Sequence, residues 1–145
     1  MAEKNEVRVE FPGRSVNEAF ARSCAACFAA QLDPTLEELG DLKTAVSEAV
    51  TNAIVHAYPY EVGRVLLKLR ILDGDVLEIT VRDWGCGIPD VEKAMEPMFT
   101  TGGEERSGMG FSIMECFTDK LRVRSKPGKG TTVVMRKKIS RRAEA

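Results

Sequence analysis

Long hydrophobic runs are missing from this sequence. A helix that crosses a membrane needs about 20 consecutive apolar residues, and no stretch of the chain reaches that length. The N-terminal residues MAEKNEVRVEF also lack the charged and then apolar order of a signal peptide. We therefore expect a cytoplasmic protein that has no membrane partner.

An excess of charge of either sign is missing as well. The chain has 22 acidic and 21 basic residues, for a formal net charge of −1. Because nonspecific attraction to nucleic acid depends on a positive excess, this balance predicts no direct nucleic-acid partner. The C-terminal stretch RKKISRRAEA is locally basic, and we expect a short solvated tail from about residue 138.

Cysteine and histidine are scarce, with four cysteines and one histidine. Cys24 and Cys27 form a CxxC pair, but neither a second pair nor a nearby histidine accompanies them, as a zinc or redox site would require. Their spacing places both on the apolar face of a helix, and cytoplasmic thiols stay reduced. We expect no metal or redox centre at this pair.

The chain does have the length and apolar content for one domain, expected over residues 1–145, because its 145 residues are 43% hydrophobic. Periodicity and turn signals predict these elements: a strand over 6–11, helices over 15–31 and 35–58, strands over 63–72 and 75–83, a short helix over 91–97, a loop over 99–110, a helix over 109–117, and strands over 120–125 and 131–138. This order predicts an α+β fold, a two-layer sandwich with helices on one face of a mixed, mostly antiparallel sheet.

The first predicted helix has two contrasting faces. Its start has the spacing of a capping box, Ser15 followed by Glu18. One face is apolar and is expected to be buried: Val16, Phe20, Cys24, Cys27 and Phe28. The opposite face has small alanines beside charged residues: Ala21, Ala25 and Ala29, with Glu18 and Arg22. A smooth alanine strip next to an arginine could accept another protein chain, although alanine is also the best helix former.

The second predicted helix carries polar residues at the border of its apolar stripe. Glu48, Asn52 and His56 are each four positions apart, so they stack on one side of the helix. A glutamate can accept a proton or orient water, and an asparagine oxygen suits a hard cation such as Mg²⁺. An ordinary polar border has the same spacing, so this row alone is a weak signal.

Two glycine-containing segments add further candidates. In DWGCGIPD, Asp83 ends a predicted strand, and Gly85 and Gly87 allow the backbone to approach a ligand, although ordinary turns have the same composition. The segment SGMGF opens the predicted helix that follows the loop. Backbone N–H groups at such a helix start bind phosphate, and Arg106 just before it could reach a terminal phosphate. No Walker GK[ST] follows.

The order of these features is more specific than any one of them. A Glu-x-x-x-Asn helix, a hairpin, a strand-end DxGxG, a loop, a GxG helix start and a closing GT strand resemble the Bergerat-type ATP-binding fold. This is the fold of the GHKL superfamily, which includes gyrase, the histidine kinases and mismatch-repair ATPases. SEAVTNAIVHAY, FTT, ERSGMGF, PGKGTTV, NEAFAR and FAAQLDPTLEEL closely resemble the bacterial anti-sigma-F factors, serine kinases of the sporulation partner-switching system. The resemblance covers about residues 6–137.

This resemblance implies an ATP-dependent protein serine kinase that sequesters a sporulation sigma factor and phosphorylates a serine on its anti-anti-sigma partner. Glu48 would be the general base, Asn52 would coordinate Mg²⁺, and Asp83 would bind the adenine amine. Arg106 would contact the γ-phosphate, and Arg22 would contact both protein partners. The other implied ATP- or ADP-binding positions are Gly85, Gly87, Thr100, Thr101, Ser107, Gly108, Met109, Gly110 and Thr131. A lid over 99–107 and a homodimer through the sheet side are also implied.

Several points stay open at this level. Trp84 occupies a variable position of the DxGxG loop and can pack on the nucleotide or on the lid. A nucleotide-gated sigma-factor binding module without significant kinase activity is an alternative function, although Glu48 argues against it. The related general-stress anti-sigma serine kinase is another alternative. The only histidine, His56, lies in the Asn52 helix, so a sensor histidine kinase with its own phosphoacceptor histidine is nearly excluded.

Overall fold

The computed structural model describes residues 2–95 and 110–140. Strands and α-helices follow one another as β1 (Glu3–Pro12), α1 (Asn17–Ala29), α2 (Leu36–Thr51), β2 (Arg64–Leu72), β3 (Val76–Asp83), α3 (Val91–Ala94), α4 (Gly110–Phe117), β4 (Lys120–Lys126) and β5 (Gly130–Lys138). A short 3-10 turn, η1 (Ala30–Leu32), follows α1, and a π-helical turn, η2 (Asn52–His56), extends α2. Within the described ranges, no helix combines the length and apolar character needed to span a membrane.

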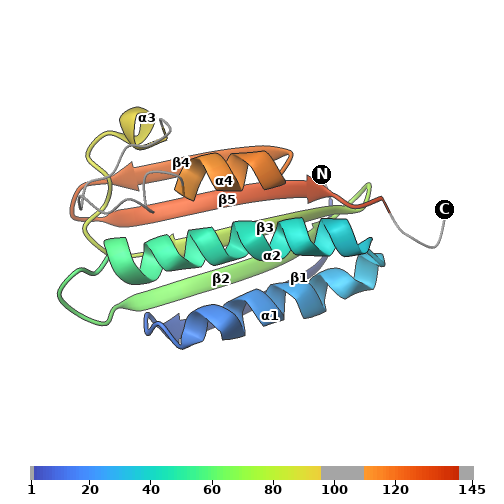
Figure 1. The fold of residues 1–145 in the computed structure, drawn as a ribbon, viewed down its shortest axis with the longest axis horizontal. Helices are drawn as coiled ribbons and strands as arrows, with labels where there is room; N and C mark the ends of the chain where they lie inside the picture. The colour runs from blue at the N-terminus through green and yellow to red at the C-terminus, as the bar shows by residue number, and fades with distance from the viewer. Residues whose placement is uncertain (1, 96–109, 141–145) are drawn as a thin grey trace.

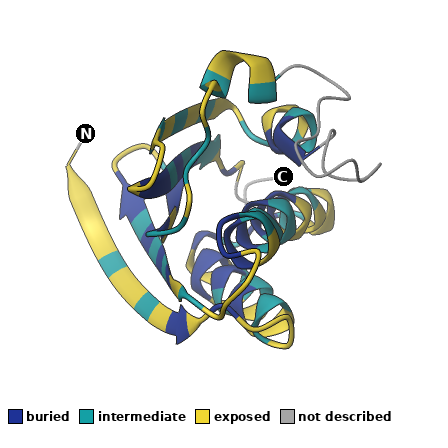
Figure 2. Cartoon of the chain, turned by 90° about the vertical axis from the view of Figure 1, so that its left-hand side faces the viewer, coloured by how far each residue is buried: buried dark blue, intermediate teal, exposed yellow. Residues whose placement is uncertain are grey.

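The strands form a single five-stranded sheet in the order β1-β2-β3-β5-β4. Helices α1, α2 and α4 lie on one face of this sheet, and the opposite face is left open by the described helices (Figures 1 and 2). The predicted α+β two-layer sandwich is therefore confirmed. Every neighbouring pair of strands is antiparallel, where a mixed, mostly antiparallel sheet was expected. Tight hairpins account for two of these pairs, β2–β3 and β4–β5.

The core lies between the helix layer and the inner face of the sheet, visible as the buried layer in Figure 2. Alternate residues of the central strands point inward and are buried: Val65, Leu67, Leu69 and Ile71 of β2, and Leu77, Ile79 and Val81 of β3. Helix α2 buries Leu42, Val46 and Val50 against them. The period of two in the strands and the helical spacing in α2 thus place one apolar face on each layer.

Helix α1 buries its alanines and only part of the apolar face that was predicted to be buried. Ala21, Ala25 and Ala29 are each 0% exposed, whereas Val16 is 76% and Phe20 is 52% exposed. The predicted alanine docking strip is therefore wrong. The predicted apolar core face is wrong for Val16, Phe20 and Cys27, which are exposed, and confirmed for Phe28, which is 7% exposed. Helix α1 packs on α2, and the small alanines suit close contact because the distance between packed helices depends on the side chains between them.

The start of α1 also differs from the prediction. The helix begins at Asn17, and no side chain caps it. Ser15 lies in a turn in which the Glu18 N–H donates to the Ser15 carbonyl oxygen at 3.2 Å, so the predicted Ser15–Glu18 capping box is wrong. A capping box forms instead at α2, where the Glu38 N–H donates to Thr35 Oγ1 and the Thr35 N–H donates to Glu38 Oε1.

The chain stays packed to the end of the described residues. Ile139, directly after β5, is 2% exposed. The backbone N–H and the hydroxyl of Ser140 donate to Glu38 Oε2 at 2.8 and 2.7 Å. Positions 138–140 of the predicted tail are therefore attached to the fold, and residues 141–145 lie outside the described residues.

Candidate functional site

A pocket of about 340 Å³ opens between the helix layer and the end of β3. This volume is in the range of sites that hold small molecules. Its lining comes from α2, η2, the loop after β3, α4 and β5, and includes Asn52, His56, Asp83, Gly87, Phe111 and Thr131. Apolar side chains form much of the wall, with Val81, Ile88 and Val133 among them. The pocket is thus a mostly apolar slot with a few polar groups.

Asp83 is the buried acidic residue in the lining of this slot, with 6% of its surface exposed. Its Oδ1 accepts hydrogen bonds from the backbone N–H groups of Gly85 at 2.9 Å and Thr131 at 3.2 Å. Burial raises the pKa of the Asp83 carboxyl, and these two hydrogen bonds oppose the shift. Within the described residues both hydrogen bonds end on Oδ1, which leaves Oδ2 to accept one from a ligand.

Gly85 and Gly87 let the loop after β3 fit between two neighbouring segments. A Cβ on Gly85 would overlap the carbonyl oxygen of Ala57, and a Cβ on Gly87 would overlap that of Lys126. Gly87 also has a φ of +77°, which L side chains rarely adopt. Gly87 lines the pocket, while the contact at Gly85 serves the packing of the loop against the end of η2.

Gly110 brings the start of α4 against two polar side chains of the α2 region. A Cβ on Gly110 would lie 3.3 Å from Asn52 Nδ2 and 3.6 Å from Glu48 Oε1. The structure therefore brings together Glu48, Asn52 and the first residue of α4, which are far apart in the sequence. Because a helix N-terminus carries partial positive charge, this corner combines an amide, a carboxylate and a site for anions.

Asn52 stands where the helix changes from α to π geometry. The Ala57 N–H donates to the Asn52 carbonyl oxygen at 3.1 Å, a bond that spans five residues. Such π turns are rare and occur frequently at functional sites, because the wider turn changes the direction of the following side chains. His56, at the end of the turn, lines the pocket. The sequence pattern predicted one uninterrupted helix over 35–58 and contained no signal for this turn.

Trp84 is not among the residues that line the pocket. Two guanidinium groups lie over its ring: the distance from Cζ to the ring centroid is 3.6 Å for Arg64 and 4.6 Å for Arg82. Its backbone N–H donates to the Tyr58 hydroxyl at 2.7 Å, and this hydroxyl donates to the Arg64 carbonyl oxygen at 2.8 Å. Burial raises the pKa of the Tyr58 hydroxyl. Sequence reasoning missed Tyr58, which holds the loop beside Asp83 in place.

Ser125 is a second residue that sequence reasoning missed. Its hydroxyl oxygen accepts a hydrogen bond from the Ile88 N–H at 2.7 Å and shares another with Thr131 Oγ1 at 2.8 Å. Ser125 therefore links the loop after β3 to the β4–β5 hairpin. A serine at an inward position of a strand was the available sequence signal, but strand register was needed to place it beside Thr131.

The remaining predicted site residues lie elsewhere. Arg22 is on α1, where its Nε forms an ion pair with Glu18 Oε2 at 3.2 Å. Six predicted nucleotide-site residues lie outside the described residues: Thr100, Thr101, Arg106, Ser107, Gly108 and Met109. The predicted lid over 99–107 is outside them as well, so the alternative in which Trp84 packs on the lid is not tested.

Comparison with known proteins defines the class of this domain. A family model described as a histidine kinase-like ATPase domain matches residues 11–137. The RsbU and RsbW domains of a Mycobacterium tuberculosis protein superpose with a TM-score of 0.68 at 17% identity, over 95% of this chain and 33% of that chain. A blue-light activated histidine kinase of Erythrobacter litoralis superposes with a TM-score of 0.59 at 24% identity, over 85% and 42%. Fold and pocket together define a histidine kinase-like ATPase domain.

Curated relatives narrow this class to one family. The anti-sigma F factor of Caldanaerobacter subterraneus is 55% identical over 97% of this chain and 99% of that protein. The anti-sigma F factor of Geobacillus kaustophilus is 52% identical over 95% of each, and that of Clostridium perfringens is 51% identical over 94% and 98%. The chain belongs to the anti-sigma F factor family.

Proposed function

We propose that this chain is an ATP-dependent protein serine kinase of the cytoplasm that also sequesters a sporulation sigma factor. One observation carries the kinase part: Glu48, Asn52 and Gly110 converge at one corner of the helix layer, beside a pocket that contains Asp83 and Thr131. The names of the relatives support the sigma-factor part, and the matched family model supports the ATPase part.

The Asp83 end of the pocket fits an adenine ring. Apolar walls suit the faces of a flat heterocycle, and the carboxylate of Asp83 can accept a hydrogen bond from the exocyclic amine. The hydrogen bonds from Gly85 and Thr131 hold this carboxylate in one orientation. Selection of adenine over guanine then follows from the chemistry of the acceptor, because guanine has a carbonyl oxygen in place of that amine.

The Asn52 end fits a triphosphate with its metal ion. Asn52 Oδ1 is an oxygen ligand of the type Mg²⁺ takes, and the start of α4 suits a phosphate. Mg²⁺, when bound, would neutralise charge on the phosphates. Glu48 would take the proton from the serine hydroxyl of the protein substrate. The serine oxygen then bonds to the γ-phosphorus as the bond to the oxygen shared with the β-phosphate breaks, leaving ADP.

The protein partners would meet α1 on its exposed side. Arg22 and the exposed Phe20 lie on this helix, and the exposed Val16 directly precedes it. An arginine beside exposed apolar side chains has the composition of a binding hot spot. The homodimer implied by the resemblance would form through the sheet side, of which strand β1 is a free edge.

The test is incubation of the purified protein with labelled ATP, Mg²⁺ and a candidate anti-anti-sigma protein, followed by phosphoamino-acid analysis. We expect phosphoserine on the partner. Glu48→Gln is expected to lower the rate of serine phosphorylation by about 10²–10⁴-fold, which is the usual contribution of a general base. Binding of ATP and of the sigma factor should persist. A Gln variant as fast as wild type would show that Glu48 is not the base.

The same assay separates the alternative functions. A wild-type protein that binds ATP and the sigma factor but transfers no phosphate is a nucleotide-gated binding module. A general-stress anti-sigma kinase would phosphorylate its partner in the same way but retain a different sigma factor. Parallel pull-downs with a sporulation and a general-stress sigma factor distinguish these two kinases.

A further inference from the structure

The open face of the sheet concentrates positive charge. A groove of about 490 Å³ runs over this face, on the side away from the helices in Figure 2. Its lining has eight cationic side chains: Arg8, Lys68, Arg70, Arg82, Lys120, Arg122, Arg124 and Arg136. Glu78 is the acidic member of the lining. We call these residues the basic sheet face.

The basic sheet face arises from strand alternation and register. Lys120, Arg122 and Arg124 are two residues apart on β4 and therefore project from the same side. Register then aligns cations from different strands, because Arg8 pairs with Lys68 across β1 and β2. The net charge of −1 does not reveal this clustering, because it sums the charges of the whole chain. The predicted absence of a nucleic-acid partner rested on that sum and not on the charge of the sheet face alone.

Three of the eight cations are paired within the described fold. Arg8 Nε forms an ion pair with Glu6 Oε2 at 2.7 Å, and Arg70 Nη1 forms one with Glu3 Oε1 at 3.2 Å. Glu78, 4% exposed, forms ion pairs with Arg70 at 2.6 Å and Arg136 at 2.9 Å. Burial acts to raise the pKa of Glu78, but the hydrogen bonds from both arginines outweigh it and lower the pKa. Five other cations of the face form no ion pair with any described residue: Lys68, Arg82, Lys120, Arg122 and Arg124.

The chemistry of the face favours a phosphate backbone over a protein. Protein interfaces depend on aromatic and aliphatic anchors at their centre, whereas the apolar members here are the half-buried Leu66 and Val134. Sequence-independent contact with nucleic acid instead uses arginine and lysine on phosphates. Single strands also need aromatic rings on which bases stack, and the Trp84 ring nearby is covered by Arg64.

We propose that the basic sheet face binds the phosphate backbone of duplex DNA without sequence preference. Five strands at about 4.8 Å spacing make a surface about 20 Å wide, comparable to a DNA duplex. The acidic residues of the helix layer are separated from this face by a helix about 10–12 Å across. This distance is greater than the screening length of about 8 Å at physiological salt, so their repulsion of DNA phosphates is largely screened. The nucleotide pocket opens on the other face of the sheet, so DNA binding is independent of the kinase function.

The test is fluorescence anisotropy of a labelled duplex of about 20 base pairs, titrated with the full chain over a series of salt concentrations. We expect saturable binding at 50 mM salt that weakens steeply at 200 mM. The double variant Arg122→Gln/Arg124→Gln is expected to bind about tenfold more weakly. The plot of the logarithm of its association constant against the logarithm of the salt concentration should be less steep by about 2, because two phosphate contacts are removed. Both side chains are exposed on an edge strand, so the fold and the ATP affinity should not change.

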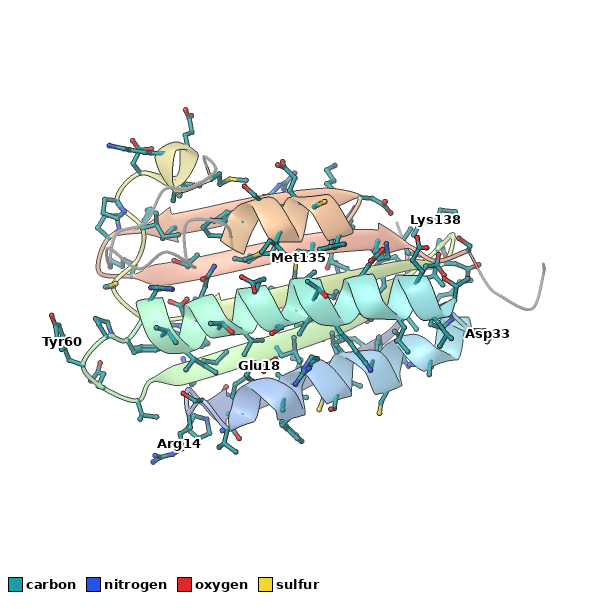
Figure 3. The ribbon with its side chains drawn as sticks, in the orientation of Figure 1. Arg14, Glu18, Asp33, Tyr60, Met135 and Lys138 are labelled. Atoms are coloured by element: carbon teal, nitrogen blue, oxygen red, sulfur yellow. The ribbon has the colours of Figure 1, made fainter. Side chains whose placement is uncertain are left out.

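The matched control, Arg14→Gln/Lys43→Gln, removes the same charge from the helix side. Both residues are exposed, and Arg14 points away from the fold in Figure 3. We expect this control to bind DNA like wild type. Absence of saturable duplex binding at 50 mM salt, equal weakening in both double variants, or tighter binding to single strands would each overturn the proposal. Tighter binding of polyglutamate than of duplex would also overturn it, and would assign the face to an acidic protein.

Discussion

The carboxylate of Asp83 accepts a hydrogen bond of 3.2 Å from the backbone N–H of Thr131, 48 residues later in the chain. This bond ties the end of β3 to β5 at the wall of the pocket. A second bond, from the Gly85 N–H to the same oxygen, closes the turn after the strand. The acid at this turn therefore does more than reverse the chain, because it is oriented from both sides and buried within a pocket.

Asp83→Asn should weaken nucleotide binding. A hydrogen bond to a charged acceptor contributes about 1.5–3 kcal/mol, so we expect the ATP dissociation constant to rise by about 10- to 150-fold. Titration with a fluorescent ATP analogue measures this change. Asp73→Asn, at the exposed β2–β3 turn, is the control and should bind like wild type. Unchanged affinity in the Asp83→Asn variant would show that Asp83 does not contact the base.

Nucleotide affinity should fall as the pH is lowered, and the fall should begin above the ordinary aspartate pKa of 3.8, because burial raises the pKa of Asp83. Protonation removes the acceptor for the adenine amine. The free energy of unfolding should change in the opposite direction and rise as the pH is lowered. A raised pKa in the folded state means that the buried charge destabilises the fold, and protonation of Asp83 at a pH below this pKa removes that cost. Isothermal titration at several pH values tests the first effect, and the Asp83→Asn variant should have a flat profile.

Gly110→Ala should lower the rate of phosphoryl transfer without lowering the stability of the fold. The added Cβ would lie 3.3 Å from Asn52 Nδ2, so the asparagine must move by a few tenths of an ångström. We expect slower phosphoryl transfer with little change in thermal stability. Gly40→Ala is the matched control, because that helical glycine has open space around it and alanine should add about 0.5–1 kcal/mol of stability. Equal transfer rates in both variants would contradict the assignment of this corner to the phosphates.

Arg22→Ala and Phe20→Ala should each weaken the sigma factor and the anti-anti-sigma protein while leaving the ATP dissociation constant unchanged. Phe20 is 52% exposed, so its removal should cost little stability. Leu36→Ala, an equally conservative change at a residue of α2 that is 78% exposed, should leave both partners bound. Loss of ATP affinity in the Arg22 variant would instead assign that arginine to the fold or the pocket.

Most elements and the fold class could be predicted from local patterns. The β2–β3 hairpin followed from alternating runs on either side of Asp73-Gly74, because a turn with Gly74 at φ +83° needs such residues. Helix α1 was predicted in place, but its alanines were placed outward although they are buried. Alanine satisfies either environment, so its position could not be decided until the close packing on α2 was known.

The nucleotide pocket was predicted from the order of its motifs rather than from any single one. Asp83, Asn52 and Glu48 were predicted as site residues; the structure places Asp83 and Asn52 in the lining of one pocket and Glu48 near Gly110 beside it, and their roles stay predictions. Tyr58, Ser125 and the π turn after Asn52 were not identified. Each acts through contacts with distant residues, and no local period or composition distinguishes such residues from their neighbours.

The sequence by itself determined which residues could share a face, because strand alternation and helical spacing are local properties of the chain. It also determined the order of the motifs that mark the nucleotide site. Only the tertiary structure decided which face of α1 is buried, where Trp84 lies, and that cations of several strands collect on one open face. Those outcomes depend on strand register and on the packing of the helices, which are set by contacts between residues far apart in the chain.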